Sequence, residues 1–205
     1  MIADIPEPER VIADLADFVP LAYGAIEAGT VEARDFFDAR GDEYESFLFS
    51  DIVRYGAKKH FERNRLQAEL EIVDLANNGL LLSHNGYPIR IRKAYRGSVS
   101  VPGSFAMEQF HAQTLRLIPE TDNPNLFVLW DVYKPSFALA PDLYVACPKK
   151  NTARFPNAAD LHWLWKLPNV ALLPGAPVEA QGFDDYEDLI IRKPGDGTQT
   201  GTEDR

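Results

Sequence analysis

Basic side chains are concentrated in one stretch of an otherwise acidic chain. The 205 residues carry a net charge of −10, yet residues 51–100 hold nine basic and five acidic side chains. Ammonium and guanidinium groups form charge-assisted hydrogen bonds with phosphate and carboxylate groups. The stretch therefore predicts contact with a nucleic acid or with an acidic partner protein. The candidate binding residues are Arg54, Lys58, Lys59, Arg63, Arg90, Arg92, Lys93 and Arg96.

The same residues also allow a plainer interpretation. Arg54 and Lys58 are four residues apart, as are Lys59 and Arg63, so each pair shares one side of a helix. Such charges can keep a helix solvated or protect a sheet edge. They can also pair with the twelve acidic residues among the first fifty. The strongly negative total charge argues against a general nucleic-acid coat protein.

Carboxylates near the basic stretch are the next candidates for chemistry. Metal-dependent cleavage of a phosphodiester needs two or three converging carboxylates, often with a lysine. The acidic residues available are Glu62, Glu69, Glu71, Asp74 and Asp131. No Asp or Glu stands two positions before a Lys, so the (D/E)xK triplet of many nucleases is missing. An atypical metal nuclease is therefore an alternative, and no metal ligands are assigned.

Three residues are candidates for a catalytic role. Asp131 interrupts the apolar run LFVLWDVY, where a carboxylate is costly unless it is paired. His111 is followed by Gln113 in a predicted helix and is a candidate general acid or base. Glu62 forms part of an HxE triplet, but the single Cys147 rules out the second half of a zinc-deaminase signature.

The only cysteine has two interpretations. Cys147 precedes Pro148-Lys149-Lys150, and the lysines could lower the pKa of its thiol and activate it. A buried thiol at the end of a strand is the expected case. One cysteine excludes a disulfide within the chain. No cofactor-binding fingerprint is found between a strand and a helix, so no cofactor is predicted.

The elements that position these residues begin with helices. Apolar spacing predicts helices at residues 6–19 and 31–40, the second capped by Thr30, and a longer helix at 42–64. The predicted apolar stripe of the longer helix comprises Tyr44, Phe47, Leu48, Ile52, Tyr55 and Phe61.

A β-hairpin gives the clearest structural signal. Asn85-Gly86 lies between two strand-like runs and predicts a two-residue type I′ turn. In that register His84 faces Tyr87 and Leu82 faces Ile89 on one side of the sheet. Leu81, Ser83, Pro88, Arg90 and Arg92 fall on the other side. We expect His84 to lie at the surface beside the turn.

The remaining pattern predicts an α+β fold with N-terminal helices and a mainly antiparallel sheet interrupted by one helix. Strands are expected near 70–75, 126–133, 142–148 and 161–167, and the intervening helix at 104–117. Residues 1–192 form one domain, with a helical part at 5–65 and a sheet part at 66–192, and residues 193–205 form a disordered tail. The absence of a signal sequence or a long apolar run predicts a cytoplasmic protein without membrane contact.

The segment NLFVLWDVYKPSFALAPDLYVACPKK, the later LHWLWKLP and the upstream RIRKA carry a resemblance. Over residues 78–167 the chain resembles uncharacterised hypothetical proteins of high-GC Gram-positive bacteria and their phages. That resemblance implies a toxin–antitoxin or phage-defence gene pair, with a protein partner encoded nearby, and assigns no catalytic residue. We therefore expect an effector that acts through its basic face. The alternatives are a catalytically inert interaction module, with or without homo-oligomer formation, and the metal nuclease.

Overall fold

A six-stranded sheet forms the centre of the molecule, in the order β1-β2-β3-β4-β5-β6. The computed structural model describes residues 5–66, 69–74, 80–94, 98–114, 122–130, 142–152 and 158–168. The strands are β1 Glu71–Asp74, β2 Leu80–His84, β3 Tyr87–Lys93, β4 Leu126–Trp130, β5 Leu143–Pro148 and β6 Leu161–Lys166. The helices are α1 Pro8–Asp14, α2 Phe18–Asp38, α3 Ser46–Asn64 and α4 Phe105–His111. This arrangement confirms the predicted α+β class.

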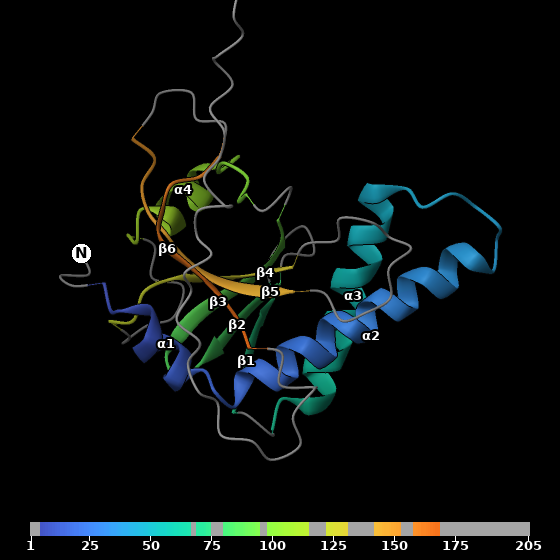
Figure 1. The fold of residues 1–205 in the computed structure, drawn as a ribbon, viewed down its shortest axis with the longest axis horizontal. Helices are drawn as coiled ribbons and strands as arrows, with labels where there is room; N and C mark the ends of the chain where they lie inside the picture. The colour runs from blue at the N-terminus through green and yellow to red at the C-terminus, as the bar shows by residue number, and fades with distance from the viewer. Residues whose placement is uncertain are drawn as a thin grey trace, which may run out of the picture.

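One strand pair differs from the rest and decides where α4 lies. Strands β3 and β4 are parallel, whereas all other neighbouring strands are antiparallel. A parallel pair needs a crossover connection rather than a tight turn. The chain between β3 and β4 contains α4, which lies apart from the other three helices (Figure 1).

The predicted hairpin is confirmed in its turn and its register. Asn85 and Gly86 have φ values of 48° and 75°, the positive angles that a type I′ turn requires. Leu82 pairs with Ile89, and His84 pairs with Tyr87. The strand predicted before the hairpin is also present, because β1 pairs with β2 in antiparallel fashion.

Helices α1, α2 and α3 cover one face of the sheet and enclose the larger core. The largest fully buried side chains of this core include Phe18, Phe61 and Trp130. The rings of Phe18 and Phe61 stack with centroids 5.9 Å apart. His84 is only 3% exposed and stacks on Phe18, so its predicted surface position is wrong. The helices cover the face that His84 shares with Tyr87.

The boundaries of the first two helices differ from the prediction. The helix expected at 6–19 is interrupted, because α1 ends at Asp14 and α2 begins at Phe18. Thr30 does not cap a helix. It lies inside α2 and donates its hydroxyl hydrogen to the carbonyl of Ile26 at 2.7 Å. A threonine within a helix can bond to the carbonyl four residues earlier, so its presence did not mark a helix start.

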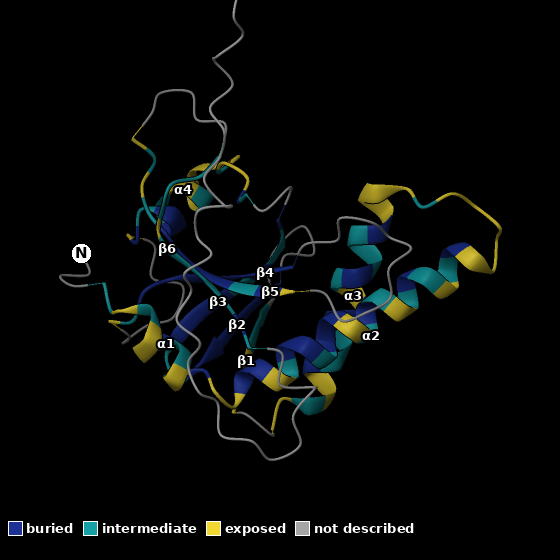
Figure 2. Ribbon diagram, viewed as in Figure 1, coloured by how far each residue is buried: buried dark blue, intermediate teal, exposed yellow. Residues whose placement is uncertain are grey.

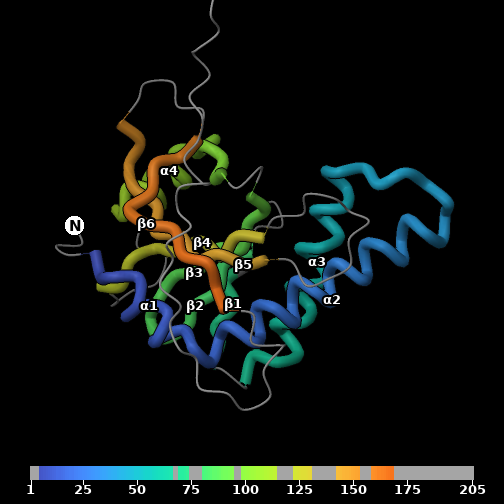
Figure 3. Tube along the Cα trace, in the orientation of Figure 1, coloured from blue at the N-terminus to red at the C-terminus, as the bar shows by residue number. Residues whose placement is uncertain are grey.

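The predicted apolar stripe of α3 is only partly right. Phe61 is buried and Ile52 packs against the larger core. Phe47 and Tyr55 are 73% and 57% exposed, whereas Phe49 and Val53 are buried. The helices α2 and α3 run side by side (Figure 3) and meet where Gly56 faces Gly29. That close backbone approach selects which side of α3 packs inward.

A second, smaller core lies on the opposite face of the sheet. Phe110 of α4 packs there with Phe127 and Leu129 of β4 and with Leu81 of β2. All five residues of β4 are buried, as expected for a strand covered on both faces. Figure 2 shows this buried centre, with exposed residues concentrated on the helices.

Several predictions fall on residues that the structure does not describe. Asp131, Arg96 and the tail at 193–205 lie outside the described ranges. The helix predicted at 104–117 is shorter than expected, because α4 ends at His111 and Gln113 has a positive φ of 58°. The division of the chain into one domain and a tail stays a prediction. In the part of the chain that is described, no helix is both long and apolar enough to cross a membrane.

Candidate functional site

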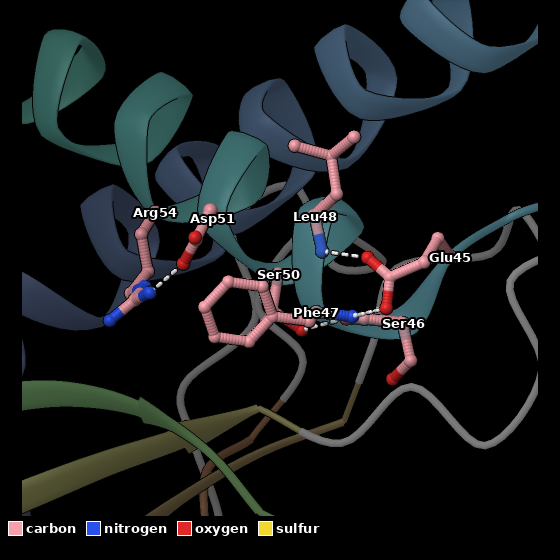
Figure 4. A network of polar contacts seen from close by, with 7 residues as sticks. All are labelled: Glu45, Ser46, Phe47, Leu48, Ser50, Asp51 and Arg54. Carbon is pink, nitrogen blue, oxygen red and sulfur yellow. Dashed lines mark hydrogen bonds and ion pairs between the residues drawn. The ribbon is translucent and has the colours of Figure 1, made fainter.

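Three of the four candidate basic residues on α3 are paired with acidic neighbours. Arg54 forms an ion pair with Asp51 (Figure 4). Lys58 lies 3.8 Å from the carboxylate of Glu62. Glu62, a catalytic candidate from the sequence, is therefore half of an ion pair on the outside of the helix.

One contact links α3 to the acidic first part of the chain. Lys59 lies 3.5 Å from the carboxylate of Glu32 on α2, and its ammonium sits 4.0 Å from the ring centroid of Tyr55. Arg63 is exposed in the last turn of α3. The four candidate binding residues on α3 therefore follow the plainer interpretation, in which basic side chains keep a helix solvated and pair with acidic residues.

Lys93 belongs to the start of α3 rather than to a shared basic face. Its ammonium donates to the Ser46 hydroxyl at 3.0 Å. Glu45 caps the same helix end by accepting hydrogen bonds from the backbone N–H groups of Phe47 and Leu48 (Figure 4). These bonds, and secondarily the charge of Lys93, lower the pKa of the Glu45 carboxyl.

Arg90 and Arg92 lie on the other face of the sheet, beneath α4. They are two residues apart on β3 and therefore project to the same side. The Arg90 guanidinium donates to the Met107 sulfur at 2.8 Å and lies 5.7 Å from the centroid of Phe110. The Arg92 guanidinium lies 5.6 Å from the centroid of Phe127. Aromatic rings thus support both cations.

Neither arginine has an anionic partner within the described ranges. The ion pairs found there involve other residues. Nη1 of Arg92 is buried and makes no hydrogen bond to any described residue. Burial lowers the pKa of both guanidinium groups. The charge of Arg92 lowers the pKa of Arg90 further, and the charge of Arg54 on α3 lowers that of Arg92. An unpaired cation in such surroundings is energetically costly.

His111 completes the group from α4. The residue is only 1% exposed, and the centroid of its ring lies 5.1 Å from that of Phe127. Both ring nitrogens are buried without a hydrogen-bond partner among the described residues. Burial, followed by the charges of Arg92 and Arg90, lowers the pKa of His111 to about 4. The imidazole is therefore neutral at pH 7 and has one donor and one acceptor.

A buried amide network holds α4 in place beside this group. The Gln113 side chain donates to the carbonyls of Asn125 and Pro148, at 3.1 and 2.8 Å, and accepts from the Asn125 N–H at 2.7 Å. The Asn125 side chain donates to the carbonyl of Phe110 at 3.0 Å. Gln113, which follows His111 closely in the sequence, anchors the end of α4 to β4 and β5. Sequence reasoning missed this role, because a glutamine and an asparagine twelve residues apart carry no local signal.

The other candidates do not assemble into a site. Cys147 is buried, and burial raises the pKa of its thiol to about 12, so the neighbouring lysines do not activate it. Within the described ranges no three His, Cys, Asp or Glu residues lie close enough to hold a metal ion. Glu71 is exposed on β1. The carboxylates proposed for a nuclease are thus not brought together in the described part of the chain.

We call Arg90, Arg92 and His111 the arginine–histidine site. It joins two guanidinium groups that have no described carboxylate partner and a neutral imidazole against the rings of Phe110 and Phe127. A guanidinium whose plane rests near a ring keeps its N–H edge for a planar or tetrahedral anion. The arrangement is suited to binding a phosphate or carboxylate group, and the weak shielding of a partly buried site strengthens such contacts.

Comparison with known proteins identifies no relative. The chain matches no family model, and the searches of curated proteins and of solved structures found no significant similarity.

Proposed function

We propose that this protein binds a phosphate-bearing ligand, a nucleotide or a nucleic-acid strand, at the arginine–histidine site. The observation that carries the proposal is the buried Nη1 of Arg92, which has no partner among the described residues although a second arginine lies two positions away. Two like charges placed side by side, with no carboxylate from the described part of the chain to balance them, oppose folding. Their arrangement is accounted for by an anion that binds to both.

The proposal narrows the effector role implied by the sequence resemblance. In a toxin–antitoxin or phage-defence pair, the arginine–histidine site would be the place where the effector meets RNA, DNA or a nucleotide. The basic residues of α3 contribute less, because Lys58 and Lys59 already face Glu62 and Glu32. A cytoplasmic location, as the sequence predicts, would give the site access to these ligands.

The test uses substitution of Arg92 by methionine, which keeps an unbranched, flexible stem and removes the guanidinium group with its charge. Binding of a labelled single-stranded RNA and of a nucleotide should weaken about ten- to hundredfold, because a charge-assisted contact contributes about 1.5–3 kcal/mol. The free energy of unfolding should stay equal or increase, because replacing a buried unpaired cation by an apolar side chain is neutral or stabilising. Urea denaturation and fluorescence anisotropy provide the two measurements.

The matched control is Arg63→Gln, which removes the same charge from the exposed end of α3. Its binding should stay within about threefold of the unmodified protein, since an exposed charge contributes little at 0.15 M salt. Equal weakening in both variants would mean that binding follows total charge rather than the arginine–histidine site. Unchanged binding by Arg92→Met would contradict the proposal directly.

A second candidate function is supported by apolar residues on the opposite side of the molecule. Val31 of α2 and Phe47, Leu48 and Tyr55 of α3 are exposed by 40–73%. Exposed apolar and aromatic side chains in one part of a structure are typical of a protein–protein contact. These residues support the alternative of a catalytically inert interaction module. Its partner would be a protein encoded nearby or a second copy of this chain.

The two candidates can be separated experimentally. Phe47→Ser should abolish co-purification with a partner encoded nearby, or dissociate a homo-oligomer in analytical ultracentrifugation, without changing phosphate binding. Arg92→Met should do the reverse. If Phe47→Ser leaves every association intact, the helical surface is not the contact.

A further inference from the structure

We infer that the arginine–histidine site selects phosphate monoesters, the dianionic end group of a nucleotide or of a nucleic-acid strand, over phosphodiesters. This inference rests on the proposed function and makes it more specific. It depends on the number of charges, the number of donors and the burial of the groups involved.

The charges favour a dianion. Arg90 and Arg92 each contribute one positive charge, since a guanidinium stays protonated in a protein. No described carboxylate pairs with either. His111 contributes no charge at pH 7. A phosphate monoester carries about two negative charges at that pH, whereas a diester carries one. A diester would therefore leave one cation uncompensated in a partly buried site.

The donors favour a terminal phosphate group. Alternate residues of a strand lie about 6.6 Å apart on one face, so Arg90 and Arg92 approach a small anion from two directions. The ring of His111 lies beside Phe127, the residue over which the Arg92 guanidinium also sits. The two guanidinium groups supply several N–H groups besides the one that the Met107 sulfur accepts. Both ring nitrogens of His111 are buried, so the ring lines the site without donating to the anion. A monoester has three free phosphate oxygens to accept the guanidinium N–H groups, and a diester has two.

Burial gives the third reason. His111, Phe110 and Phe127 are between 0% and 1% exposed, whereas Arg90 and Arg92 are partly exposed. A ligand therefore enters on the side of the arginines and has apolar rings and α4 behind it. A phosphate at the end of a molecule can stop there. The phosphate of a diester must connect to a second group that continues past it.

The experiment compares two ligands that differ in this one property. Adenosine 5′-monophosphate is a monoester, and adenosine 3′,5′-cyclic monophosphate is a diester with the same base and sugar. Isothermal titration of the full chain at pH 7.5 and 0.15 M salt should show the monoester binding at least tenfold more tightly. That preference corresponds to about 1.4 kcal/mol. It needs no variant, so it does not depend on whether a substituted chain folds.

A second pair of ligands identifies the source of the phosphate. A ten-nucleotide RNA with a 5′-phosphate is compared with the same RNA ending in a 5′-hydroxyl. Tighter binding of the phosphorylated RNA than of both the hydroxyl-ended RNA and the free nucleotide would support the inference and assign the group to a strand end. Binding of the nucleotide alone would support it and assign the group to a free nucleotide.

The outcomes separate the inference from the proposed function. Equal affinity for the monoester and the cyclic diester, with both lost in Arg92→Met, would overturn the selectivity and keep the phosphate site. Failure of all four ligands to bind would overturn both. A preference for the monoester that persists unchanged in Arg90→Met and Arg92→Met would place the selective site elsewhere and overturn the inference.

Discussion

Replacing His111 by glutamine removes a titratable group that the fold keeps neutral. In the folded protein the pKa of His111 is lowered from 6.5 to about 4, chiefly by burial and then by Arg92 and Arg90. The unfolded chain takes up a proton near pH 6.5, whereas the folded chain does so only near pH 4. The contribution of the neutral ring to stability is therefore complete above the unfolded pKa. It is lost progressively as the pH falls from about 6.5 to 4.

The size of the effect follows from the two pKa values. The whole shift corresponds to about 3 kcal/mol, of which about 2 kcal/mol is lost by pH 5. The charged groups that act on the ring are Arg90 and Arg92 of β3. The adjoining strand β4, Leu126–Trp130, contributes no charged group, and Glu108 on α4 is exposed. The expected pH dependence is thus set by burial and by the two arginines.

The assay is urea denaturation at pH 7, 6 and 5, for the unmodified chain and for His111→Gln. Between pH 7 and pH 5 the unmodified chain should lose about 2 kcal/mol more unfolding free energy than the variant. The control is His162→Gln, which removes the exposed imidazole of β6 and should reduce the pH dependence much less. Parallel pH profiles for the unmodified chain and His111→Gln would refute the buried neutral imidazole.

Three further predictions concern packing and reactivity. Gln113→Leu leaves buried backbone groups without partners and should lower the unfolding free energy by about 3 kcal/mol or more in urea denaturation. Gly29→Ala would press a Cβ against the Val53 carbonyl oxygen and should lower the unfolding free energy by more than about 2 kcal/mol. Gly103→Ala, with open space around it, should lower it by less than about 0.5 kcal/mol. The Cys147 thiol, with its pKa raised to about 12, should react with a disulfide reagent only after unfolding, and rapid reaction of the native protein would contradict its burial.

Parts of the fold that depend on neighbouring residues were predictable from the sequence. Asn85 and Gly86 accept positive φ angles at low cost, so they specify the type I′ turn and, through it, the register of β2 and β3. The alternation of side chains then places Arg90 and Arg92 together on one face. The unbroken apolar run of β4 indicated burial on both faces.

Predictions that required choosing between faces were right only in part. Apolar residues occur on several sides of α3, so periodicity alone selected Phe47 and Tyr55, which are exposed, over Phe49 and Val53, which are buried. The close contact between Gly29 and Gly56 makes that choice, and it joins residues from two helices. His84 was misplaced for a related reason, because its strand pairing did not reveal which face the helices would cover.

The sequence by itself determined the α+β class, the hairpin register and the shared direction of Arg90 and Arg92, because short-range backbone geometry controls all three. Tertiary structure alone decided that His111 lies beside them. The parallel pairing of β3 with β4 requires a crossover, and the crossover brings α4 to the face that carries the arginines. Tertiary structure also decided that Lys58 and Lys59 lie beside carboxylates, whereas Arg92 lies beside none among the described residues. Charge and spacing along a chain identify candidate residues, but only packing shows which of them are paired.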